Sequence, residues 1–134
     1  MKKIASWLTG IFLLAACGAE PENVTQSGRS FVLNNPENGA TVTLNFDANE
    51  NRFYGKVVNN YFGSYEVNGL QIKFGNPAST MMMGPLPLME AESNYLKTIE
   101  KVDSFALEGK ILKLRTPDGT VLKFQEEVAP ETTD

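Results

Sequence analysis

The fold is decided by the stretch Asn59-Asn60-Tyr61-Phe62-Gly63-Ser64-Tyr65. Within it Tyr61, Gly63 and Tyr65 stand at every second position, which is typical of a strand with one face toward a core. Asn59 and Gly63 indicate a backbone under special demands, a bend at the asparagine and a conformation closed to other residues at the glycine. The alternative is a recognition surface that contacts a ligand by hydrogen bonding and stacking. We expect the structural role, because backbone geometry alone accounts for both residues.

The surrounding sequence repeats this alternation of apolar and polar residues. The side chains expected to point inward are Val42, Leu44, Phe46, Leu70, Ile72, Phe74, Phe105 and Leu107. The pattern predicts eight antiparallel strands, at residues 30–34, 41–46, 52–58, 62–67, 70–75, 104–108, 111–115 and 120–125. Eight strands are enough to close a small lipocalin-like barrel, or to form a strongly curved sheet, with an interior nearly filled by side chains. The expected fold class is mainly β.

Turn residues separate the expected strands. Asn68-Gly69 is typical of a type I′ hairpin. Glu108-Gly109-Lys110 reads as another tight turn, and Pro117-Asp118-Gly119 combines a fixed φ with a glycine that can take a positive φ.

One segment, at about residues 90–101, has the period of a helix instead. Its apolar residues recur at three- and four-residue spacing: Tyr95, Leu96, Ile99 and Val102. Glu90 and Glu92 fall in the expected first turn and lysines in the last, as the helix dipole prefers. Pro85 and Pro87 are expected to stop a strand from running into this amphipathic helix.

Two further motifs accompany the opening stretch: Ser79-Thr80-Met81-Met82-Met83-Gly84 and Glu92-Ser93-Asn94-Tyr95-Leu96. Together the three motifs resemble the META domain of HslJ-type heat-shock lipoproteins, from about Phe31 to Phe124. The family-motif residues, to which the resemblance gives a structural or binding role, are Asn59, Tyr61, Gly63, Tyr65, Thr80 and Met82. The resemblance also implies one helix closing an end or side of the barrel.

The chain departs from the family at two cysteine positions. Members of the family often have a Cys directly before the motif Asn and a second one after the Thr-x-Met-x segment, where this chain has Val58 and Gly84. A Gly commonly precedes the first Cys, and here Val57 stands there. The two losses are coherent, because they leave no unpaired thiol.

Residues 1–16 are predicted to be a lipoprotein signal peptide. Two lysines precede an apolar run of thirteen residues, Ile4 to Ala16, which is shorter than the roughly 20 that span a membrane. The run ends in Leu14-Ala15-Ala16-Cys17-Gly18, which resembles a lipobox, so we expect cleavage before Cys17 and lipidation of its thiol. An ordinary secretory signal is the alternative.

Lipidation at Cys17 would hold the protein on a membrane, because several acyl chains make release negligible. Gly18 and Ala19 follow in place of the Asp that favours the inner membrane of enteric bacteria, so we expect the outer membrane, facing the periplasm. Residues 17–29 are then a flexible tether, residues 30–125 the META-like domain, and residues 126–134 an acidic disordered tail.

The charge of the mature chain excludes one class of partner. Without residues 1–16 the chain has 10 basic and 16 acidic residues, a net charge of −6. Nucleic acid is therefore not an expected partner. Membrane contact is expected through the anchor at Cys17, and a protein or small-molecule partner in the envelope stays open.

Catalytic chemistry has little support in the sequence. The chain has no His and one Cys, so the commonest general base and metal ligand are absent. Ser79 and Thr80 have no activating base at a recognised spacing, and Glu90 and Glu92 point in different directions on a helix. A carboxylate pair from separate strands stays open, but nothing selects one. We predict no enzyme, no catalytic residue and no cofactor.

The methionines Met81, Met82, Met83 and Met89 allow two interpretations. Thioethers are soft ligands that select Cu(I), but methionine is also a flexible filler of irregular cores. No His supports a metal cluster, and we predict no metal site.

Three functions follow from these expectations. The resemblance implies a non-enzymatic envelope lipoprotein that supports stress tolerance or tolerance of novobiocin-type antibiotics. The alternatives are a protein-binding inhibitor of a basic hydrolase such as lysozyme, whose loop signature rich in Ser, Gly and Lys is not found, and a small-ligand carrier. A carrier would require a barrel interior that its own side chains do not fill.

Overall fold

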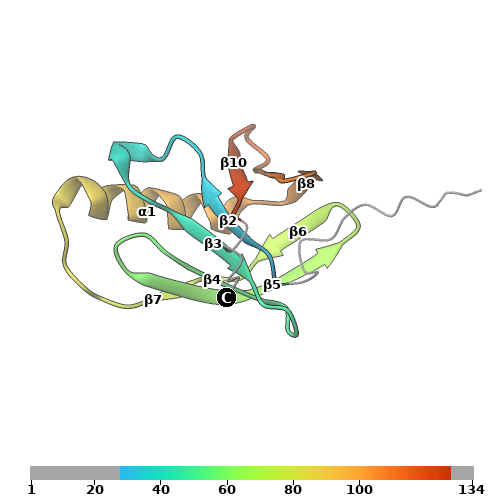
Figure 1. The fold of residues 1–134 in the computed structure, drawn as a ribbon, viewed down its shortest axis with the longest axis horizontal. Helices are drawn as coiled ribbons and strands as arrows, with labels where there is room; N and C mark the ends of the chain where they lie inside the picture. The colour runs from blue at the N-terminus through green and yellow to red at the C-terminus, as the bar shows by residue number, and fades with distance from the viewer. Residues whose placement is uncertain (1–27, 128–134) are drawn as a thin grey trace, which may run out of the picture.

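The computed structural model describes residues 28–127 (Figure 1). The predicted signal peptide, Cys17 and almost all of the predicted tether lie outside these residues, as does the predicted tail from residue 128 on. The predictions made for them stay predictions.

The described chain forms an antiparallel barrel of eight strands in the order β4-β3-β2-β10-β9-β8-β6-β5, which the β4–β5 pairing closes. The strands are β2 (Ser30–Leu33), β3 (Thr43–Phe46), β4 (Arg52–Lys56), β5 (Asn60–Asn68), β6 (Gln71–Phe74), β8 (Ser104–Glu108), β9 (Ile111–Arg115) and β10 (Val121–Glu126). The predicted mainly β fold is therefore confirmed, as a closed barrel. All eight predicted strands are present, with ends that differ by at most two residues.

A short ninth strand and two helices complete the fold. Strand β7 (Ala78–Ser79) pairs with the first half of β5, beyond the place where β6 ends. A 3₁₀ turn, η3 (Glu37–Gly39), lies between β2 and β3. The α-helix of residues 28–127, α1 (Leu86–Lys101), packs beside β6 and η3 (Figure 1). Strands β6 and β8 meet at only one residue pair, which makes their seam the weakest of the barrel. The helix packs beside β6 at this seam.

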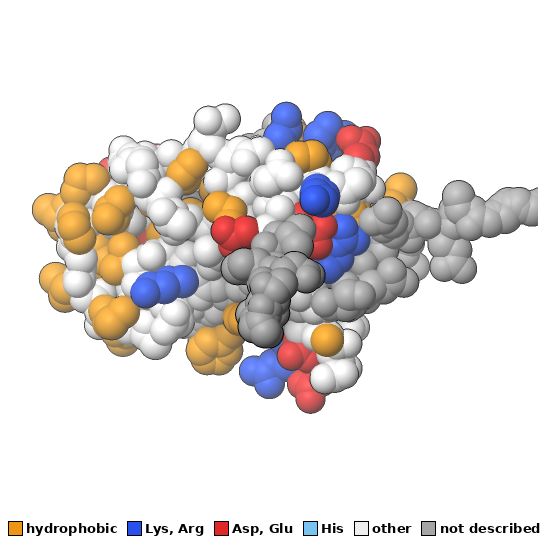
Figure 2. Space-filling view, viewed as in Figure 1, with side chains coloured by type: hydrophobic (Ala, Val, Ile, Leu, Met, Phe, Trp, Pro, Cys, Tyr) orange, Lys and Arg blue, Asp and Glu red, His pale blue; other side chains and the backbone are white. Residues whose placement is uncertain are grey.

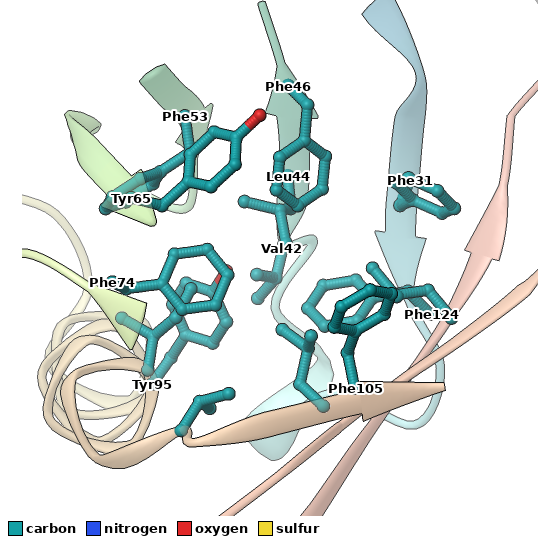
Figure 3. Close-up of a cluster of buried hydrophobic side chains, with 14 of the residues drawn as sticks. Phe31, Val42, Leu44, Phe46, Phe53, Tyr65, Phe74, Tyr95, Phe105 and Phe124 are labelled. Carbon is teal, nitrogen blue, oxygen red and sulfur yellow. The ribbon is translucent and has the colours of Figure 1, made fainter. Parts of the chain in front are cut away.

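Aromatic rings fill the barrel interior (Figure 3). Phe53 and Phe74 meet edge to face with ring centroids 5.0 Å apart, and Phe46 meets Tyr65 in the same way at 5.3 Å. Edge-to-face contacts at these distances are favourable beyond the area that they bury. The barrel interior is therefore filled by side chains, as expected. This packing does not support the alternative of a carrier with a ligand inside the barrel.

Two expectations about local structure were wrong. The helix begins at Leu86 rather than near residue 90, because Pro85 caps it and Pro87 lies in its first turn, where a missing N–H costs nothing. Glu90 and Glu92 therefore lie beyond the first turn, which holds no acidic residue.

The β5–β6 hairpin also differs from the expectation. Asn68 pairs with Gln71, so the turn consists of Gly69 and Leu70, and Leu70 is 53% exposed instead of inward. Only Gly69 has a positive φ, of 64°. This is the pattern of a type II′ turn rather than the predicted type I′.

Among residues 28–127 no helix is long and apolar enough to cross a membrane.

Candidate functional site

Asn59 is the centre of a buried polar cluster at one end of the barrel. It lies between β4 and β5 and is only 3% exposed. Its side-chain oxygen accepts hydrogen bonds from the Thr80 hydroxyl (3.0 Å) and from the backbone N–H of Met82. Its amide nitrogen donates to Glu92 Oε2 (2.9 Å) and to the Met82 carbonyl (3.3 Å). We call Asn59, Thr80, Met82 and Glu92 the Asn59 clamp.

Glu92 binds the other side of the same bend. Its Oε1 accepts hydrogen bonds from the backbone N–H groups of Val58 (3.0 Å) and Asn59 (2.7 Å). The residue is 7% exposed, on the face of α1 that packs against the barrel. A buried carboxylate is costly unless hydrogen bonds satisfy it, and here three donors do so. The sequence reading placed Glu92 in the motif but gave it only a dipole role, because nothing in the local pattern tells a buried glutamate from an exposed one.

The Thr80 hydroxyl acts both as a hydrogen-bond donor and as an acceptor. The hydroxyl donates to Asn59 and accepts the backbone N–H of Asn60 at 3.1 Å. The Thr80 backbone N–H also donates to the Asn60 carbonyl at 3.0 Å. This hydroxyl therefore ties the segment after β7 to the start of β5, and its hydrogen-bond partners among the described residues are Asn59 and Asn60, neither of which is a base that would activate a nucleophile.

The clamp holds a loop whose apolar side chains point into solvent. Met82 is fixed through both its backbone groups, while Met81 is 94%, Met83 87% and Leu86 79% exposed. We call residues 81–87 the methionine loop. Figure 2 shows a concentration of apolar side chains at the end of the molecule where α1 begins. Met81, Met82 and Met83 are thus not core fillers, whereas Met89 is partly buried.

The two positions that carry cysteines in the family lie in contact. A Cβ built on Gly84 would be 2.9 Å from Val58 Cγ1 and 3.8 Å from Val58 Cβ. The bend before β5 and the methionine loop are therefore packed together at these two residues. Here a valine methyl group and a glycine hydrogen fill the space.

The motif tyrosines are buried inside the barrel. Tyr61 is 1% and Tyr65 2% exposed, so neither ring offers a stacking surface. The Tyr61 hydroxyl donates to the Thr43 carbonyl and lies 2.7 Å from the Tyr95 hydroxyl of α1. Because Tyr61 has a single hydroxyl proton, Tyr95 must be the donor in that pair. The two hydroxyl groups link the helix to the barrel wall.

Burial raises the pKa of all three buried tyrosines. Desolvation is the main cause for Tyr61 and Tyr95, and it raises the pKa of Tyr65 to about 12. None of them is prepared to act as a base near neutral pH. The Tyr65 hydroxyl has no hydrogen-bond partner among the described residues.

Gly63 is required for space rather than for its backbone angle. Its φ is not in the positive region, which corrects the expectation of a conformation closed to other residues. A Cβ at this position would lie 2.8 Å from Phe53 Cζ, on the paired strand β4. Gly55 is a similar case that the sequence did not reveal, since a Cβ there would lie 2.6 Å from the Tyr61 hydroxyl.

Beyond the clamp, a groove of about 380 Å³ lies between α1 and the start of β10 on the described surface, and hollows of similar volume lie elsewhere on it. Tyr95 and Val42 contribute to its lining, and Asn35, Asn94 and Lys123 supply polar groups. Residues 28–127 contain no group of three or more His, Cys, Asp or Glu side chains placed to hold a metal ion. The strongest assembly of motif residues is the clamp with its loop.

Comparison with known proteins gives a family and a fold. The META domain family model matches residues 20–129. An NMR structure of a protein from Burkholderia xenovorans is similar over 84% of this chain and 94% of its own, with a TM-score of 0.66 and 21% sequence identity. At that identity the similarity concerns the fold alone. No curated protein matches.

Proposed function

The chain belongs to the META domain family, and from that premise we propose that it is a non-enzymatic, lipid-anchored binding protein of the bacterial cell envelope. The observation that supports this proposal is the Asn59 clamp. Its polar side chains bind one another and the backbone, and what they present to solvent is an apolar loop. An active site would need a reactive group with a base or acid near it, whereas a displayed apolar loop suits binding.

The anchor in this proposal is the thiol of Cys17. The support for it is the lipobox-like segment Leu14-Ala15-Ala16-Cys17 after a short apolar run. Gly18 and Ala19 favour the outer membrane, with the domain facing the periplasm. Two or more acyl chains would make the attachment effectively permanent.

The cellular role in this proposal is tolerance of stress or of novobiocin-type antibiotics. HslJ-type lipoproteins are the usual context of META domains, and that context is the support for this part. A strain that lacks the gene tests it, complemented with the parent gene, with Cys17→Ser or with Asn59→Ala. We expect the parent to restore growth on novobiocin and after heat shock, and both variants to restore less.

Asn60→Ala is the matched control, because Asn60 is the exposed neighbour of Asn59. Metabolic labelling with a radioactive fatty acid measures acylation in the same strains, and the label should be lost only with Cys17→Ser. Equal labelling of Cys17→Ser and the parent would contradict the anchor. Unchanged tolerance in the deletion strain would contradict the cellular role.

A further inference from the structure

The methionine loop is the most exposed apolar feature of the described molecule. It contains Met81, Met83 and Leu86, each more than three-quarters exposed, with the exposed Pro85 and Pro87 between and beside them. No charged residue lies between Lys73 and Glu90, a run of 16 residues. An apolar patch of this kind marks an interaction site.

The loop is held rigidly although it is exposed. The Asn59 side chain binds both backbone groups of Met82, and Gly84 packs against Val58. The proline residues at 85 and 87 restrict the backbone further. Because the backbone of the loop is already ordered, docking of the loop would cost little additional backbone entropy.

We propose that the methionine loop inserts into the acyl-chain region of the bilayer to which the protein is anchored, so that the barrel is held in a fixed orientation on the membrane. This inference rests on the lipid anchor put forward in the proposed function. The thioether and isobutyl side chains supply apolar area, and the loop brings no charge that would have to be desolvated.

The length of the chain between anchor and barrel permits this orientation. The described structure begins beside β3 and the loop before β4, since Arg29 O accepts the Phe46 N–H and Gly28 lies against Ala48. The methionine loop is at the opposite barrel end, one length of β4 away, which for five residues is about 17 Å. Residues 18–27 can extend about 33 Å, so the tether can reach past the barrel and still place the loop at the bilayer.

Charge opposes a second copy of the chain as the partner of the loop. The mature chain has a net charge of −6, so two copies repel each other, and anionic headgroups repel the domain as well. Contact with the membrane must then come from apolar insertion, which is the chemistry that the loop offers. A lipid interior also needs no concave partner surface to receive the loop.

Tryptophan fluorescence tests the proposal in the acylated protein. Trp7, the only tryptophan of the chain, lies in the segment expected to be removed before Cys17, so the acylated protein is itself a silent background. Met83→Trp then reports on the loop, and Leu70→Trp is the matched control, since Leu70 is an exposed apolar residue at the opposite barrel end. Both proteins are reconstituted into vesicles of phosphatidylethanolamine and phosphatidylglycerol with brominated acyl chains.

We expect strong quenching and a blue shift of the fluorescence for Met83→Trp, and neither for Leu70→Trp. Equal, weak quenching of the two would overturn the proposal. Shielding of Met83→Trp from aqueous acrylamide without vesicles, rising with protein concentration, would also overturn it and identify a second copy as the occupant.

A second measurement separates the loop from the anchor. In a chain that begins at residue 18, and so lacks both the signal segment and the acylated cysteine, flotation with vesicles reports on the loop alone, and Met83→Ser should lower the partition constant about tenfold relative to that chain. If the protein carries no acyl label but Met83→Trp is still quenched, the proposed lipid anchor is contradicted and the proposed loop insertion is supported. If the acylated protein floats with the vesicles but Met83→Trp is not quenched, only the proposed loop insertion is contradicted.

Discussion

A disulfide placed between residues 58 and 84 should form and stabilise the protein. The Cβ of Val58 and a Cβ built on Gly84 are 3.8 Å apart, within the roughly 3.5–4.5 Å that disulfides require. Gly84 is not among the glycines with a positive φ, so a cysteine fits its backbone. The double variant Val58→Cys/Gly84→Cys, made with Cys17→Ser to remove a competing thiol, should therefore oxidise without rearrangement.

The expected gain follows from the loop that the bond would close. The 27 residues from Val58 to Gly84 give about 3.5 kcal/mol in the chain-entropy relation. Replacing the buried part of Val58 costs roughly 1 kcal/mol, so the oxidised double variant should gain about 2–3 kcal/mol over the parent. The gain should disappear on reduction.

Urea melts with and without reductant measure this difference, and thiol titration counts the free cysteines. The single variant Gly84→Cys is the control. Its new Cβ meets Val58 Cγ1 at 2.9 Å, so it should be less stable than the parent in both conditions. Two free thiols in the folded double variant after oxidation would refute the packing of the loop against Val58.

Three further predictions concern the barrel. Gly63→Val should lower the free energy of unfolding by about 1–3 kcal/mol through overlap with the Phe53 ring, measured by urea melts; unchanged stability would contradict the tight contact. Tyr65→Phe should be neutral or stabilising, since it removes a buried hydroxyl without a described partner, whereas Tyr61→Phe should cost about 1–2 kcal/mol in the same melts; equal losses would be inconsistent with this assignment. Arg29 forms an ion pair with Glu126, its guanidinium donating to both carboxylate oxygens at 2.8 and 3.0 Å. These hydrogen bonds lower the pKa of Glu126, so its carboxylate stabilises the fold above the ordinary carboxyl pKa and loses that effect as the pH falls. Glu126→Gln should thus cost about 1 kcal/mol near pH 7 and less near pH 3 in melts at the two values, and a loss independent of pH would argue against the ion pair.

The strands could be predicted because one barrel face is buried and the other is not. Val42, Leu44 and Phe46 are all buried, as their alternation indicated. The prediction that Leu70 points inward was wrong, because it rested on hydrophobicity alone. Gly69 takes the positive φ that sets the turn, and Leu70 follows it as the second, exposed turn residue. Strand β7 has only two residues, too few for any periodicity to reveal it.

The sequence could predict which residues belong to the clamp, but not which contacts they make. The motif resemblance named Asn59, Thr80 and Met82, but their hydrogen bonds join segments more than 20 residues apart in sequence. The role of Glu92 depends on its place on α1: it lies beyond the first turn and shares the buried face with Tyr95 and Ile99. Exposure of the methionine loop could not be inferred, because methionine is common in cores as well.

Asn59→Ala, compared with Asn60→Ala, tests most directly whether the family motif is a clamp for the methionine loop. The account predicts that Asn59→Ala lowers the free energy of unfolding by about 2–4 kcal/mol, since it removes four hydrogen bonds at a buried site. It also predicts faster hydrogen exchange at the Met82 amide. Asn60→Ala should change neither quantity. Parent-like stability and parent-like Met82 exchange in Asn59→Ala would contradict the clamp.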